Sequence, residues 1–446
     1  MGVWSGPEAT EKVTPCWERI SMPIIKPLQV VQDALEEFLA TTFKNNPQRK
    51  HLANYITGLM ISDNKTVAGM TDEMPNASDQ SCLNRFLTEV EWDEQAMNQA
   101  RIDWHQKFED TKFHSRGIIP IDDVLVDKHG KYIKDSGTFW DHSEQRYKHA
   151  QDLIIVNYVH PQSGKHFPLY FRRFKKKDQC EWTGEEFKKM TALTIELIDW
   201  CQEKGVLGCF TFDSFYTCAE IQNHINSLKD EDGIVRGYVG DLKFNRKIVF
   251  KGVEQQAVEF ARTIPPKDRK PVTVDGKKQW FLSVCVTMPN VDHKVRITIL
   301  YKHKNDKEPR KILVTNKIFW NAERIIETYR GRWTGTETFH RDGKQELGLG
   351  DCQLRDGVGQ TRHTYCVFLA HSLLMQSLGK TSLSGMTSAR LTTIGESCRA
   401  LLKESIRNMI GWIVEELDIA RSIGGNVVKR LDAILHRLGL SPLARR

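Results

Sequence analysis

The residues with the clearest chemical potential lie in segment 329–344. Glu337 and Lys344 are seven positions apart, two turns of an α-helix, so they place opposite charges on one helical face. Tyr329 and Arg332 precede them in the same segment. Carboxylates bind hard cations, whereas guanidinium and ammonium groups bind phosphate. The segment therefore predicts a site that holds metal ions and phosphate together.

Further carboxylates follow two predicted strands. Asp122 and Asp123 come after the apolar run 117–121, and Asp213 closes the apolar run 206–212. Neighbouring residues of a strand point to opposite faces, so only one of Asp122 and Asp123 can face a shared site. Strand ends of an α/β sheet are places where ligands bind. These acids are therefore candidate ligands for a hard cation such as Mg²⁺.

The spacing in segment 329–344 resembles a known signature. Tyr329-x2-Arg332 and Glu337-x6-Lys344 are similar to the Tyr-x2-Arg…Glu-x6-Lys pattern of bacterial insertion-sequence DDE transposases, which are RNase H-like enzymes. The interval from Arg332 to Glu337 is one residue longer than this family usually has. Segment 79–88 also resembles the N-terminal region of one branch of these enzymes. The resemblance covers most of residues 50–375.

The resemblance implies a DNA transposase that cleaves transposon ends and transfers the freed 3′-hydroxyl into target DNA. It implies that Asp122, Asp213 and Glu337 are catalytic and hold two Mg²⁺ ions, for which Mn²⁺ can substitute. Two such ions stabilise the attacking and the leaving oxygen of a phosphoryl transfer. The expected partners are double-stranded DNA, both terminal repeats and target, and a second copy of the chain in the synaptic complex. The expected DNA-binding residues of this segment are Tyr329, Arg332 and Lys344.

The choice between the two neighbouring aspartates depends on the same resemblance. The family has Thr or Ser two positions after its first Asp, and this chain has Val124 there. That position favours Asp122 without excluding Asp123, and Asp127 is a less favoured third candidate. Pro120 is unusual in a central strand because proline lacks the N–H that a ladder uses.

Charge and composition agree with a polyanionic partner. The 446 residues include 64 Lys and Arg against 57 Asp and Glu, a net charge of +7. Basic runs occur at 172–177 and 302–311, and from the first we select Arg172 and Arg173 as DNA-binding candidates. Such runs can equally be solvated loops. The ten cysteines contain no Cys-x2-Cys pair, which indicates reduced thiols. No apolar run reaches the roughly 18 residues of a membrane span, so we expect a cytoplasmic, nucleoid-associated bacterial protein.

The elements that must position these residues follow from hydrophobic periodicity. The expected fold class is α/β, an RNase H-like mixed sheet flanked by helices, with a β-rich insertion and all-helical N- and C-terminal regions. The core pattern is three strands, a helix and a strand, which matches the opening of that fold. The expected elements are strands 117–126, 153–159 and 166–171, helix 183–204, strand 206–213, helix 215–228 and strand 235–239. The expected divisions are 1–115 (helical, DNA-binding), 116–242 (catalytic core), 243–315 (β-rich insertion), 316–380 (catalytic core with the Glu helix) and 381–446 (helical).

The extra residue before Glu337 has a geometric consequence. Five residues of a regular α-helix turn about 500°, which would separate Arg332 from Glu337. We therefore expect a local break or widening within 333–336, with Gly335 as the point where the backbone yields and both side chains facing one cleft. Trp333 and Phe339 are expected to pack in the core.

Other interpretations remain open. Asp213 could cap a helix that begins at Ser214, and Glu337 with Lys344 could belong to a solvated surface helix. At the level of function, the alternatives are an RNase H-like nuclease without strand transfer and a domesticated DNA-binding protein without turnover. A strand-transfer assay separates the first alternative from a transposase, and acids at all three positions argue against the second.

Overall fold

The computed structural model describes residues 23–274, 276–379 and 390–438. In the first described stretch, every regular element before β1 is a helix, as the sequence predicts. Asp79 and Asp93 start two of these helices by accepting backbone N–H bonds with their side chains. The helices are α1 (Gln29–Glu37), α2 (Asn46–Ile61), α3 (Val67–Asp72), α4 (Gln80–Thr88) and α5 (Glu94–His105).

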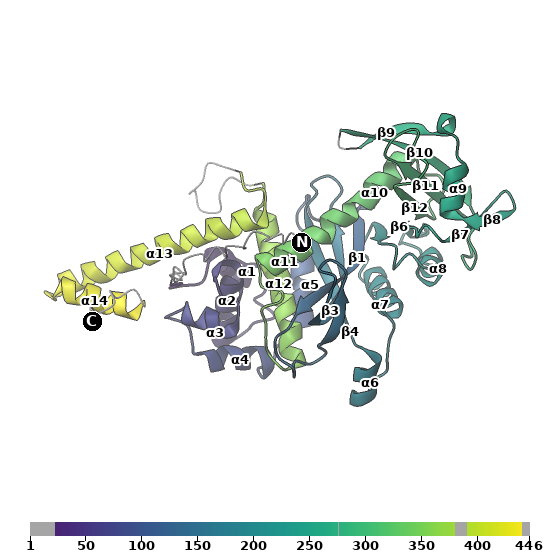
Figure 1. The fold of residues 1–446 in the computed structure, drawn as a ribbon. Coiled ribbons are helices and arrows are strands. Elements are labelled where there is room, and N and C mark those ends of the chain that lie inside the picture. Colours follow the sequence, from purple (N-terminus) through teal and green to yellow (C-terminus); the bar gives the residue numbers. More distant parts are fainter. Residues whose placement is uncertain (1–22, 275, 380–389, 439–446) are drawn as a thin grey trace, which may run out of the picture.

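The centre of the molecule is a mixed sheet with the core order β4-β3-β1-β5-β6 (Figure 1). Strands β1, β5 and β6 are parallel, whereas β3 and β4 are antiparallel to their neighbours. This order agrees with the predicted RNase H-like fold. The core strands are β1 (Ile118–Asp127), β2 (Gly137–Asp141), β3 (Arg146–Val159), β4 (His166–Phe174), β5 (Cys209–Phe212) and β6 (Gly237–Asp241).

The β-rich insertion continues this sheet. Strand β12 pairs antiparallel with β6, and β11, β10 and β9 follow in that order. Strands β7 and β8 form a separate hairpin. The insertion contains β7 (Lys247–Phe250), β8 (Val253–Gln256), α9 (Ala257–Thr263), a 3-10 turn (Pro266–Asp268), β9 (Lys270–Val274), β10 (Lys277–Val286), β11 (Val295–Tyr301) and β12 (Lys311–Thr315).

Helices cover both faces of the sheet. The helices α7 (Met190–Glu203) and α8 (Ala219–Ser227) pack on the face that carries Ile119 and Ile121 of β1. The opposite face carries Val124 and is covered by another set of helices. These helices are α10 (Ala322–Gly335), α11 (Glu337–Gln345) and α12 (Gly357–Ser377).

Two glycines bring α10 close to the sheet. A Cβ at Gly331 would lie 2.2 Å from Cδ1 of Ile118, and one at Gly335 would lie 2.4 Å from Cγ of Pro120 and 2.7 Å from Cγ2 of Val159. Such distances are closer than side chains can approach, so any larger residue would lift the helix. Glycine at these two positions therefore allows α10 to pack closely against β1 and β3.

The prediction of a helical C-terminal region is confirmed for its described residues, 390–438; residues 381–389 and 439–446 lie outside the described part of the chain. Helices α13 (Ile394–Ser422) and α14 (Val427–Arg437) form a hairpin that projects away from the sheet, drawn in yellow in Figure 1. A capping box at Thr393 and Glu396 starts α13. None of the described helices has the length and apolar character needed to cross a membrane.

Several predicted boundaries were wrong. Helix 183–204 begins at Met190, because Gly184 in the left-handed region (φ 70°) ends a separate helix, α6 (Lys177–Thr183). Helix 215–228 begins at Ala219, because Asp213 organises a turn before it. The sequence analysis did not predict β2, α6 or α9.

Candidate active site

The parallel strands align three aspartates. Residues 118–120 of β1 pair with residues 209–211 of β5, and continuing this register by two positions brings Asp122 level with Asp213. Continuing the pairing of β5 with β6 by one position brings Asp213 level with Asp241. Residues that are level on neighbouring strands point to the same face. The sheet therefore presents a row of acids on the face that α10 covers.

Asp122 and Asp123 point to opposite faces, and their partners differ. The Oδ2 atom of Asp122 lies 2.5 Å from Nη1 of Arg332 on α10. The Oδ1 atom of Asp123 accepts a hydrogen bond of 2.7 Å from the hydroxyl of Tyr216, on the face of α7 and α8. The ladder between β1 and β3 omits Ile119 and Pro120, which removes the difficulty of a proline in this strand.

The electrostatics of Asp122 link it to the other acids. Burial raises its pKa, Arg332 opposes that shift, and repulsion from Asp123, Asp213 and Glu337 raises the pKa further, to about 8. The side chain is 15% exposed and that of Arg332 is 11% exposed, so both charges are largely removed from water. Several carboxyl groups therefore surround Asp122, and a single guanidinium, that of Arg332, opposes their effect.

Asp213 performs a structural task as well. Its Oδ1 accepts hydrogen bonds from the backbone N–H of Phe215 (2.8 Å) and Tyr216 (3.2 Å). The predicted alternative was a cap for a helix starting at Ser214, but α8 starts at Ala219, so Asp213 shapes a turn instead.

The helix break occurs where the extra residue lies. Thr336 separates α10 from α11 with φ −97° and ψ −65°, and its hydroxyl donates to the carbonyl of Arg332. The predicted break within 333–336 is confirmed, but Gly335 is helical and packs on Pro120, so it is not the point that yields. Arg332 contacts Asp122, and Glu337 lies within electrostatic range of the same carboxylate.

Tyr329 belongs to a neighbouring polar group. Its hydroxyl accepts a hydrogen bond of 3.1 Å from Nζ of Lys311, which also lies 2.9 Å from Oδ2 of Asp241. Neither Asp241 nor Lys311 was predicted from the sequence. Asp241 ends a strand just as Asp213 nearly does, and that position was the available signal.

A basic cleft lies between α10 and the insertion. Its lining includes an aromatic side chain, Trp333, which is 64% exposed, so the prediction that Trp333 packs in the core was wrong. Phe339, by contrast, is buried as predicted. The charged and aromatic lining residues are Lys277, Arg310, Lys311, Tyr329, Arg330, Arg332 and Trp333.

The remaining predicted residues lie apart from Asp122. Lys344 is exposed at the far end of α11, in electrostatic range of Asp127 and Asp141. Arg172 pairs with Glu196 at 2.8 Å. The side chain of Arg173 is 10% exposed and pairs with Asp135 at 3.0 Å. The structure therefore uses Arg172 and Arg173 in internal ion pairs.

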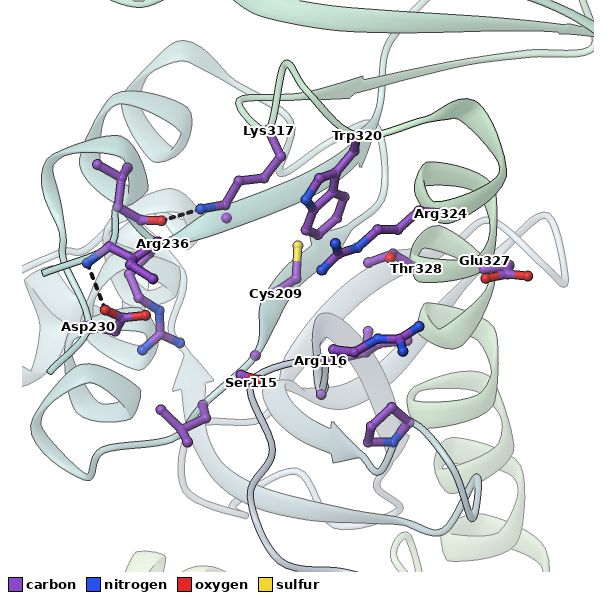
Figure 2. A pocket seen from close by; sticks show the side chains of 18 of the residues that line it. Ser115, Arg116, Cys209, Asp230, Arg236, Lys317, Trp320, Arg324, Glu327 and Thr328 are labelled. Atoms are coloured by element: carbon purple, nitrogen blue, oxygen red, sulfur yellow. Dashed lines mark hydrogen bonds between the residues drawn. The ribbon is translucent and has the colours of Figure 1, made fainter. Parts of the chain in front are cut away.

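A second pocket lies at the opposite ends of the strands. Figure 2 shows Cys209 at its centre, with Arg116, Lys317 and Arg324 around it. Lys317 donates to the carbonyl of Val235, so its charge is already satisfied by the backbone. The amino ends of β1 and β5 line this pocket, so it is separate from the row of acids.

The donor set of the acidic row fits divalent magnesium. Its potential ligand atoms are carboxylate oxygens, the hard donors that Mg²⁺ prefers. Burial is the main cause of the raised pKa of Asp122, and repulsion from Asp123, Asp213 and Glu337 adds to it; a bound cation would offset both effects. The fit therefore rests on donor type and on charge.

Comparison with known families gives an independent finding. Residues 38–231 match the family described as DDE superfamily endonuclease. The matched range contains Asp122 and Asp213 and ends before Glu337. No curated protein matches the chain. The chain thus carries a DDE superfamily endonuclease domain over residues 38–231.

Proposed function

We propose that this protein is a DNA transposase, which cleaves at transposon ends and joins the freed 3′-hydroxyl to target DNA. The observation that supports this most strongly is the grouping of Asp213, Glu337 and Arg332 around Asp122. The DDE superfamily endonuclease domain supports the cleavage reaction.

Asp122, Asp213 and Glu337 would hold two Mg²⁺ ions, with Mn²⁺ as a substitute. When bound, such ions stabilise charge on the attacking and leaving oxygens of a phosphoryl transfer. Arg332 contacts Asp122 in the free protein. The guanidinium of Arg332 has a planar fork that suits phosphate, and it would bind a DNA phosphate beside these carboxylates.

The basic cleft would bind the DNA end beside the acids. Lys277, Arg310 and Lys311 line it together with Tyr329 and Arg332, so phosphates can be neutralised along its length. The exposed Trp333 offers a flat surface on which an unpaired base can stack. Lys344, at the far end of α11, would contact a phosphate farther along the same DNA.

The proposed reaction has two steps. In the first, water attacks the phosphorus at the element end, the new O–P bond forms, the P–O3′ bond breaks, and the 3′ oxygen acquires a proton. In the second, that 3′-hydroxyl attacks a target phosphodiester and displaces the target's own 3′ oxygen. Both are in-line phosphoryl transfers, so one set of carboxylates can serve both.

The helical ends of the chain would supply binding surfaces. Helices α2 to α4 lie where we propose a DNA-reading region, and Arg85 of α4 is exposed there. Helix α13 and its C-terminal cap residue expose four large apolar side chains that a second copy of the chain could cover, which supports a homodimer in the synaptic complex. These residues are Ile410 (54% exposed), Val414 (51%), Ile419 (57%) and Ile423 (77%).

The test combines cleavage and joining. DNA that carries the inverted repeats flanking the coding region is incubated with protein, Mg²⁺ and a target plasmid. A transposase releases the 3′ ends and covalently joins them to the plasmid. Cleavage without joined product would identify the nuclease alternative. Specific end binding with neither reaction would identify the DNA-binding alternative.

A further inference from the structure

A second group of potential metal ligands lies on the other side of α11. His166 begins β4, Asp342 lies within α11, and His371 lies within α12. Ligand atoms of these three side chains all lie within 4.8 Å of one another. The residues are 6%, 7% and 0% exposed, respectively. Among the described residues, no other group of three or more such side chains meets this distance.

The two histidines are unusual for buried rings. Among the described residues, none meets the geometry of a full hydrogen bond to a ring nitrogen of His166 or His371, although the backbone of Gly164 lies close enough to His166 to favour its protonation. A neutral histidine ring has one nitrogen with a free electron pair, which can accept a hydrogen bond or bind a metal ion. Buried polar atoms are normally paired, and an orphaned atom often indicates an ion or water that binds there.

The geometry favours an ion over a direct hydrogen-bond network. The ring centroids of His166 and His371 are 5.5 Å apart, and the side chains converge without bonding one another. In a tetrahedral zinc site, two ligand atoms at about 2.0–2.1 Å from the metal lie roughly 3.4 Å apart. Small rotations of the three side chains would close the 4.8 Å group to that spacing.

The surroundings can hold and admit such an ion. The ring of Phe339 lies 5.0 Å from that of His371 and shields one side. Asp342 also pairs with Arg341 at 3.1 Å, which fixes the carboxylate as an outer partner fixes many metal ligands. A surface pocket lined by Lys165, Thr334 and Met375 reaches His166, which provides an entry path.

We propose that His166, Asp342 and His371 bind one Zn²⁺ ion. Two imidazole nitrogens and one carboxylate oxygen form a donor set that suits zinc, whereas Mg²⁺ selects oxygen donors alone. The ion would tie β4, α11 and α12 together. Because Glu337 begins the same helix, this site would fix α11 without touching the DNA. The proposal does not depend on the proposed transposition.

The test measures zinc in the whole chain after its affinity tag has been removed. The protein is stripped with a chelator and titrated with Zn²⁺ in excess Mg²⁺, which keeps the carboxylate row supplied with its own ion. We expect one zinc per chain. His166→Gln, His371→Gln and Asp342→Asn should each weaken binding by more than the roughly 10–100-fold that loss of an outer partner costs.

Matched variants separate this site from its neighbours. His340→Gln removes another buried histidine of α11 that lies outside the group of three. Glu337→Gln removes one of the proposed catalytic acids. Both should retain one zinc. Less than a tenth of an equivalent in the unaltered chain, or equal affinity in the three ligand variants, would overturn the proposal.

Cobalt provides a readout that does not depend on variants folding. Co²⁺ in a four-coordinate site absorbs visible light far more strongly than hydrated Co²⁺. Strong bands that appear with one equivalent of Co²⁺ and disappear on adding Zn²⁺ would support the site. A spectrum that stays like that of hydrated Co²⁺ would overturn it, even if a ligand variant failed to fold.

Discussion

The two faces of β1 carry neighbouring acids in different surroundings. Asp122 faces α10 and is paired with Arg332, while Asp123 faces Tyr216 and Asp152 on the α7 side. Burial raises the pKa of each, but only Asp122 has a guanidinium against it. A guanidinium beside a buried carboxyl group opposes the effect of burial and favours the ionised form. The difference supports the proposal that catalysis takes place on the α10 face, whereas the side chains of the other face pack in the core.

The largest expected effect comes from replacing one acid at a time with its amide and measuring DNA cleavage. Asp122→Asn and Glu337→Gln should each lower DNA cleavage by about 1,000-fold or more, because metal ligation stabilises transition-state charge by several kcal/mol. Asp123→Asn should keep most of the cleavage rate. Binding to end DNA, measured by gel shift, serves as the control and should persist in all three variants. If Asp123→Asn abolished cleavage and Asp122→Asn did not, the faces would be assigned the wrong way round.

The second test concerns how closely α10 lies on its face of the sheet. Gly335→Ala should lower the free energy of unfolding by about 1–3 kcal/mol, because its methyl group would overlap Pro120 and Val159. Cleavage should fall too, since the helix that carries Arg332 would be lifted. Gly411→Ala in α13 is the matched control: no described atom lies within 4 Å of an added Cβ. It should stabilise the protein by up to about 1 kcal/mol. Equal effects in chemical denaturation would contradict the close packing.

The third test uses pH. The pKa of Asp122 is about 8 in the folded protein, above the ordinary value of 3.8, so the folded state holds a proton that the unfolded state has lost. Stability from this group is therefore greatest below pH 4 and declines as pH rises toward 8. Between pH 5 and 7 its contribution should fall by about 1.4 kcal/mol per pH unit.

The measurement compares denaturant unfolding of the metal-free protein and of Asp122→Asn at several pH values in chelator. The variant should lose that part of the slope. If stability changed with pH equally in the two proteins, Asp122 would be ionised in the folded protein over the whole pH range tested. The effect of burial on its pKa would then be smaller than we expect.

The smallest expected effect concerns the two basic runs, 172–177 and 302–311, and the salt dependence of DNA binding. In run 172–177, Arg172 and Arg173 are engaged in ion pairs, whereas Lys304 and Lys307 of run 302–311 are exposed. Lys304→Glu should reduce the slope of log affinity against log salt by about 1. Arg172→Gln should leave that slope nearly unchanged. If Arg172→Gln also reduced the slope of log affinity against log salt, run 172–177 would contact DNA after all.

The sequence predicted much of this molecule because the relevant patterns are local. The apolar run of β1 and the apolar run that Asp213 closes each lie within one short segment. The break near Thr336 was also predictable, since it follows from counting residues around a helix.

The rest depended on contacts between distant segments. The alignment of Asp241 with Asp213 depends on strand register, and the exposure of Trp333 depends on where α10 rests on the sheet. His166, Asp342 and His371 are separated by 176 and 29 positions, so no spacing rule could join them. Internal partners of Arg172 and Arg173 likewise appear only after folding.

Helix α10 also has a mechanical consequence. It contacts β9 and β12 of the insertion, β5 and β6 at the centre, and β1, β3 and β4 beyond them. A rod attached along its length transmits force as one body, and Thr336 is its joint with α11. A load that DNA applies to the insertion would therefore travel along α10 and arrive at the joint beside Glu337. DNA binding at the insertion could thus change the position of the Glu337 carboxylate.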